Sequence, residues 1–141
     1  MRNPDDREIK ELLASARTIA VVGLSDKPQR DSYRVAAYLK EQGYRIIPVN
    51  PTLKEAVLGE RAYSDLSAVP VPVDIVNIFR RSEEVPGVVA AALAGNPPRA
   101  VWMQLGIVNE DAAAAAASRG VTVVMDRCIM VEHRRLFGNA R

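Results

Sequence analysis

A short apolar run that ends at a glycine and passes into a helix constrains the fold of this chain more than any other stretch. Residues 18–22 (TIAVV) carry no charge and are rich in β-branched side chains, a pattern typical of a strand buried on both faces of a parallel sheet. Gly23 ends the run, and a glycine permits both a positive φ and the close approach of a ligand to the backbone. Val35, Tyr38, Leu39 and Gln42 then follow at helical spacing, and Gly43 ends the predicted helix. The stretch is therefore predicted to be a strand, a turn and a helix.

The turn between this strand and this helix is polar and basic. It carries Ser25, Lys27 and Arg30, and Asp31 or Ser32 stands where a side chain commonly caps the first turn of a helix. The free amides at the start of a helix and the positive end of its dipole attract anions. We therefore predict that this turn binds phosphate groups.

Four further apolar runs alternate with helical patterns along the chain. The predicted strands after the first are 44–50, 73–79, 99–103 and 121–125, and the other predicted helices are 1–16, 80–94, 112–119 and 126–137. Apolar strands that alternate with helices predict an α/β fold, with a doubly wound five-stranded parallel sheet and helices on both faces. We expect the strand order 3-2-1-4-5, with Pro48 near a strand end or on an edge. A length of 141 residues predicts one domain, 1–141, with the helix within 1–16 packed on it.

The composition excludes several classes of protein. A single cysteine, Cys128, excludes an internal disulfide and a cysteine-based zinc site, and a single histidine, His133, excludes a zincin motif. A net charge of +2 gives no reason to expect nucleic acid as a partner. The sequence contains neither a signal peptide nor about 18 consecutive apolar residues, so we expect a cytoplasmic protein that does not contact a membrane.

The predicted turn does not match the common dinucleotide and nucleoside triphosphate motifs. The dinucleotide fingerprint needs three glycines and an acidic residue after the second strand, but only Gly23 is present, and Asn50 stands at the acidic position. The Walker motif is absent as well. These features disfavour NAD. A wider turn with Ser25, Lys27 and Arg30 suits a ligand that carries several phosphates.

Four short motifs at the ends of the predicted strands point to a family. They are Gly23-Leu24-Ser25 with Pro28 and Tyr33, Val49-Asn50-Pro51, the segment 101–106 (VWMQLG), and Asp126-Arg127-Cys128. In this order the motifs resemble those of small stand-alone CoA-binding proteins. They are also similar to the amino-terminal CoA-binding domain of the succinyl-CoA synthetase α subunit, over about residues 18–137. The resemblance implies a Rossmann-like fold, in agreement with the α/β pattern.

The resemblance also implies where CoA, or an acyl-CoA, would bind. The phosphates would lie at the turn around Ser25 and Arg30, the adenosine between the loops at 50–51 and 79–80, and the pantetheine arm toward 104–106. The candidate cofactor-binding residues are therefore Gly23, Leu24, Ser25, Lys27, Arg30, Tyr33, Asn50, Pro51, Phe79, Arg80, Gln104, Gly106 and Cys128. Cys128 has two interpretations, a small buried hydrophobic residue or a thiol near the thiol of CoA.

Three functions remain open from the sequence. A ligase of the synthetase type passes phosphate through a histidine of a second domain, and this sequence ends where that domain would begin. We therefore expect a non-catalytic CoA-binding protein without a metal site, which has a regulatory role or acts with a protein partner. The first alternative is the CoA-binding part of a split acyl-CoA ligase or transferase. The second is an NAD-binding redox-sensing domain, against which the single glycine and Asn50 argue.

Overall fold

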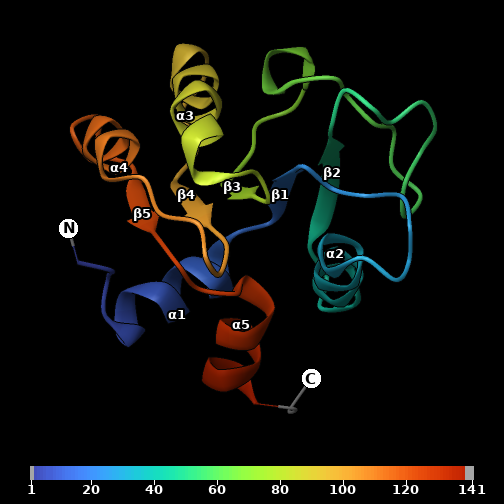
Figure 1. The fold of residues 1–141 in the computed structure, drawn as a ribbon. Coiled ribbons are helices and arrows are strands. Elements are labelled where there is room, and N and C mark those ends of the chain that lie inside the picture. Colours follow the sequence, from blue (N-terminus) through green and yellow to red (C-terminus); the bar gives the residue numbers. More distant parts are fainter. Residues whose placement is uncertain (1, 139–141) are drawn as a thin grey trace.

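Five parallel strands form the centre of the computed structural model, which describes residues 2–138 (Figure 1). The strands are β1 (Thr18–Val22), β2 (Arg45–Val49), β3 (Ile75–Ile78), β4 (Ala100–Met103) and β5 (Thr122–Val124). All four neighbouring pairs run parallel. Nearly every strand residue is buried, because helices or loops cover both faces of the sheet. The predicted α/β class with a Rossmann-like parallel sheet is confirmed.

Five helices cover the sheet in two layers. They are α1 (Asp6–Ser15), α2 (Asp31–Glu41), α3 (Val85–Ala94), α4 (Glu110–Ala117) and α5 (Ile129–Phe137), with short 3₁₀ turns η1 (Leu66–Ala68) and η2 (Ser82–Glu84). The helices α1, α2 and α5 pack on one face, and α3 and α4 pack on the other (Figure 1). The helix predicted within 1–16 is therefore present and packs on the sheet. In the described part of the chain, no helix is long and apolar enough to cross a membrane.

The strand order corrects our prediction. The order is β2-β1-β3-β4-β5 rather than 3-2-1-4-5, so β3 pairs with β1 and β4 instead of standing at the edge. All four residues of β3 are buried, as expected of a strand inside the sheet. β2 is the edge strand, where Pro48 does not interrupt a second ladder. The direction of strand addition therefore reverses between β1 and β3, and the ligand crevice of such a sheet lies at this reversal.

The connection from β2 to β3, residues 50–74, contains η1 but no α-helix. Backbone hydrogen bonds hold it against the edge strand, from Tyr63 N to Pro48 O at 2.9 Å and from Asn50 N to Tyr63 O at 2.9 Å. The connection thus joins the edge strand to the centre of the sheet as a long loop, which can be followed in green in Figure 1.

The two predicted helices that follow β3 and β5 begin later than the sequence predicts. The predicted helix 80–94 begins as η2, and α3 begins at Val85 with Pro86 in its first turn, where proline is tolerated. The predicted helix 126–137 begins at Ile129, because Asp126 adopts a φ of 60° and Cys128 is extended. Both late starts leave short loops at the carboxyl ends of β3 and β5.

Candidate functional site

Three clefts lie beyond the carboxyl ends of the strands and share parts of their walls. The first cleft, of about 620 Å³, lies between the β1–α2 turn and the residues that follow β2. The second cleft, of about 760 Å³, shares Asp31 and Phe79 with it and extends to the loop after β4 and the start of α5. The third cleft, of about 250 Å³, shares Arg80 with the second and is also lined by Pro51. An elongated ligand can therefore extend from one cleft into the next.

Gly23 stands at the reversal of strand order, directly after β1. Its φ is 93°, and its N–H donates to Val49 O at 2.8 Å. A Cβ added there would lie 2.3 Å from Phe79 O, much closer than real contacts allow. The positive φ that the sequence permits is thus present. The close approach at this glycine comes from the backbone after β3, whereas the sequence suggests a ligand in that place.

The start of α2 is free of a side-chain cap. Arg30 is the N-cap residue and makes no capping hydrogen bond, so the predicted cap by Asp31 or Ser32 is wrong. Ser32 Oγ instead accepts from Ser25 N at 3.0 Å, and Ser25 Oγ accepts from Lys27 N at 3.0 Å. These bonds fold the turn over the start of α2, whose first amides lack intrahelical partners. The arrangement is suited to an anion.

Two cations line the first cleft without a protein partner. Within residues 2–138, the side chains of Lys27 and Arg30 form no ion pair or hydrogen bond, and both residues are exposed. The carboxylate of Asp31 is already paired with Arg34 in the next helical turn. The first cleft therefore presents the cations Lys27 and Arg30 beside the uncapped helix, together with the carboxylate of Asp26.

Asn50 holds the loops after β1 and β2 together. Its Nδ2 donates to Leu24 O at 3.1 Å, and its Oδ1 accepts from Thr52 N at 3.1 Å and from Thr52 Oγ1 at 3.0 Å. Both ends of this amide thus have partners within the protein. The contact of Asn50 with adenosine stays a prediction, and its positioning role is one that the sequence did not reveal.

Gln104 anchors the second cleft. The residue is 6% exposed, and its Oε1 accepts from Asn77 Nδ2 at 3.2 Å and from Ile129 N at 3.3 Å, which ties α5 to β3 and β4. Its Nε2 has no hydrogen-bond partner among residues 2–138, and the side chain lines the cleft. Cys128, the half-buried N-cap residue of α5, lines the same cleft. In the sequence, the polar residue Asn77 within the apolar run 73–79 is the feature that indicates this hydrogen-bond network with Gln104.

Asp126 and Arg127 position the walls of the second cleft. Asp126 Oδ1 accepts from Gly106 N at 2.7 Å, and Arg127 O accepts from Trp102 Nε1 at 2.8 Å. Arg127 also pairs with the buried Glu132 at 2.9 Å. Hydrogen bonds from Arg135, and then from Arg127, hold the pKa of the Glu132 carboxyl below its usual value, against the opposing effect of burial. These residues fix the loop after β4 against α5.

The structure brings most of the thirteen candidate residues to these clefts. Those that line at least one cleft are Gly23, Ser25, Lys27, Arg30, Asn50, Pro51, Phe79, Arg80, Gln104, Gly106 and Cys128. Leu24 and Tyr33 line none of the three. Leu24 is fully buried in the core, and Tyr33 is half-buried and packs against it.

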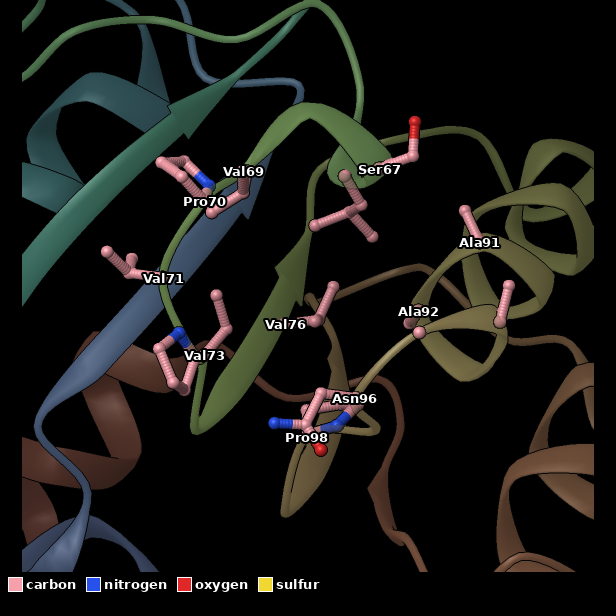
Figure 2. Close-up of a pocket in the computed structure, with 14 residues that line it drawn as sticks. Ser67, Val69, Pro70, Val71, Val73, Val76, Ala91, Ala92, Asn96 and Pro98 are labelled. Atoms are coloured by element: carbon pink, nitrogen blue, oxygen red, sulfur yellow. The ribbon is translucent and has the colours of Figure 1, made fainter.

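A fourth cavity lies on the face that α3 covers and shares Leu66 and Ala91 with the third cleft. It measures about 430 Å³, and Figure 2 shows side chains of the β2–β3 connection opposite Ala91 and Ala92 of α3, with Val76 of β3 between them. It is also lined by residues that precede β3 and β4, and thus reaches the amino ends of these strands. No charged side chain lines it. This cavity therefore lacks the charge that a phosphate ligand needs.

Within residues 2–138, no cluster of three or more histidine, cysteine or acidic side chains is suited to a metal ion.

Comparisons with known proteins agree on one family. Residues 17–134 match the family described as CoA binding domain. An uncharacterized protein of Bacillus subtilis, YneT, is 50% identical over 133 residues, which span 94% of this chain and 97% of YneT. A hypothetical protein from Pyrococcus horikoshii has a similar structure, with a TM-score of 0.91 and 35% identity over 98% of both chains. The α subunit of an ADP-forming acetate–CoA ligase from Pyrococcus furiosus is 41% identical over 63 residues, 44% of this chain but only 14% of that subunit.

Proposed function

Because the chain belongs to the family of CoA-binding domains, we propose that it binds coenzyme A or an acyl-CoA across the three connected clefts. The observation that carries this proposal is the pair of unpaired cations, Lys27 and Arg30, beside the uncapped start of α2. The diphosphate of CoA bears charges that these groups neutralise, and charge-assisted hydrogen bonds to phosphate are among the strong ones.

The proposed ligand extends along the shared walls of the clefts. The phosphates bind at Ser25 and Arg30, and the adenosine binds between Pro51 and Arg80, where the second and third clefts meet. The pantetheine arm passes Phe79 into the second cleft and reaches Gln104. Asp31 and Phe79 join the first cleft to the second, and Arg80 joins the second cleft to the third.

The proposed role is that of a non-catalytic binding protein. His133 is 1% exposed, its Nδ1 lies 2.8 Å from Tyr38 Oη, and its ring stacks on Phe137. It lines none of the three clefts, so it is poorly situated to carry a phosphoryl group between substrates.

The alternative, a CoA-binding part of a split ligase, is supported by the partial match to the acetate–CoA ligase subunit. A separate chain that restores acyl-CoA formation from acid, ATP and CoA would favour that alternative.

Calorimetric titration with CoA and with NAD tests the choice of ligand. We expect CoA to bind and NAD to bind much more weakly, because the turn lacks the glycines and the acidic residue that position a dinucleotide. A thermal-shift assay should rank CoA and NAD in the same order. A ligand at about 100 times its dissociation constant stabilises the fold by about 2.7 kcal/mol. NAD binding that equals or exceeds CoA binding would refute the proposal.

The reaction of Cys128 with CoA disulfide tests whether the thiol end of the bound ligand lies near the start of α5. With CoA disulfide as the oxidant, the Cys128 thiolate attacks one sulfur of the disulfide. A protein–CoA mixed disulfide forms and one CoA thiolate leaves. We expect intact-protein mass spectrometry to show this adduct for the native protein, its reversal by dithiothreitol, and no adduct for Cys128→Ser. Labelling that occurs only after unfolding would show that the thiol end of CoA does not reach Cys128.

A further inference from the structure

The second cleft has one charged wall and one uncharged wall. The wall formed by α2 and the residues after β3 carries Arg34, Arg80, Arg81, Asp31 and Glu83. The opposite wall, formed by the loop after β4 and the start of α5, carries no charged side chain among the residues that line the cleft. A ligand that occupies this cleft thus meets two different chemical surfaces.

The uncharged wall is aliphatic and open to solvent. Leu105 is 68% exposed and Val131 is 48% exposed, and both line the cleft together with Ile107 and Met130. Large aliphatic side chains at such exposure on two converging elements form a surface that an apolar group can cover. The third large hydrophobic residue of high exposure, Val108 at 42%, lies in the same loop but does not line the cleft.

One side-chain amide donor, that of Gln104, stands on the same wall. The Gln104 side chain is almost fully buried, its Oε1 is used by Asn77 and Ile129, and its Nε2 is the polar group that it presents to the cleft. An amide N–H donates to a carbonyl oxygen. A ligand with a carbonyl followed by an apolar chain would satisfy both Gln104 and the aliphatic wall.

We propose that the uncharged wall of the second cleft binds the acyl chain of an acyl-CoA whose acyl group is uncharged. Gln104 Nε2 donates to a carbonyl near the thioester, and the chain covers Leu105, Ile107, Met130 and Val131. This inference rests on the proposed binding of CoA, because the first cleft must hold the phosphates of CoA for the acyl group to reach this wall.

Competition binding with CoA, acetyl-, butyryl- and hexanoyl-CoA tests the inference. We expect the affinity to rise by about two- to fourfold for each methylene group that the wall covers. Succinyl-CoA, which ends in a carboxylate, should gain nothing over acetyl-CoA. Leu105→Ser should remove most of the preference for hexanoyl-CoA over free CoA. Val108→Ser, the matched control in the same loop, should behave as the unmodified protein.

The outcomes separate this inference from the proposed function. If CoA and hexanoyl-CoA bind with equal affinity, CoA binding stands and the acyl site is refuted. Succinyl-CoA binding more tightly than hexanoyl-CoA would assign the acyl group to the charged wall and would also overturn the inference. If Leu105→Ser weakens CoA and hexanoyl-CoA equally, the wall binds pantetheine rather than the acyl chain. If none of these ligands binds, both proposals fail.

Discussion

Gly23→Ala is expected to destabilise the fold by about 3 kcal/mol or more. The left-handed conformation costs a residue with a Cβ about 1–2 kcal/mol, and overpacking typically adds about 1–3 kcal/mol. Here the added Cβ would lie 2.3 Å from Phe79 O, a backbone atom that cannot move without shifting the end of β3. Denaturant unfolding should show the loss as a lower midpoint, and thermal unfolding as a decrease of about 10 °C.

Gly120→Ala is the matched control for this substitution. Gly120 also has a positive φ, 77°, but no atom lies within 4 Å of the position where its Cβ would be. It therefore isolates the conformational cost of about 1–2 kcal/mol from the cost of the close approach. Equal destabilisation by the two substitutions would show that the contact between Gly23 and Phe79 is not tight.

Arg30→Ala is expected to weaken CoA binding by about 1.5–3 kcal/mol, the range for hydrogen bonds to charged groups. This loss corresponds to about a tenfold to 150-fold increase in the dissociation constant. The free energy of unfolding should barely change, because the Arg30 side chain is exposed and forms no hydrogen bond or ion pair in the described chain. Isothermal titration calorimetry measures the affinity, and urea unfolding measures the stability.

Two further variants define what Arg30 contributes. Arg30→Lys keeps the charge but loses the planar fork, so we expect an intermediate affinity. Arg119→Ala removes another exposed arginine that follows α4 and lines none of the clefts, so CoA affinity should not change. An Arg30→Ala variant that binds CoA as well as the Arg119→Ala control would move the phosphates away from this turn.

Local sequence patterns predicted the elements well, because apolar runs and helical spacing reflect burial within each segment. The order of the strands depends on pairing between distant segments, and local patterns do not encode it. Pro48 nevertheless carried a signal, since the predicted order would have given its strand two neighbours and proline is confined to edge positions. The position of Pro48 therefore favours an edge strand, which the order 3-2-1-4-5 does not give it.

The location of the candidate site could be predicted from the sequence, but its hydrogen bonds could not. Its location followed from the rule that ligands bind beyond the carboxyl ends of parallel strands, and the basic turn was visible in the sequence. The hydrogen bonds of Ser32, Asn50 and Gln104 were not, because each joins segments that meet only after folding. The sequence therefore predicted most of the residues that gather at the three clefts, but not which of them already have partners in the protein.

The long loop from β2 to β3 has a consequence for how a ligand enters and leaves. It contributes Asn50, Thr52 and Leu53 to the first cleft and Pro51 and Leu66 to the third, yet it contains no α-helix and is hydrogen-bonded to the edge strand. Local opening of such a segment requires much less free energy than unfolding of the central strands. The proposed ligand could thus exchange through a sub-global fluctuation that leaves the sheet intact, and once bound it would add its own contacts to this segment.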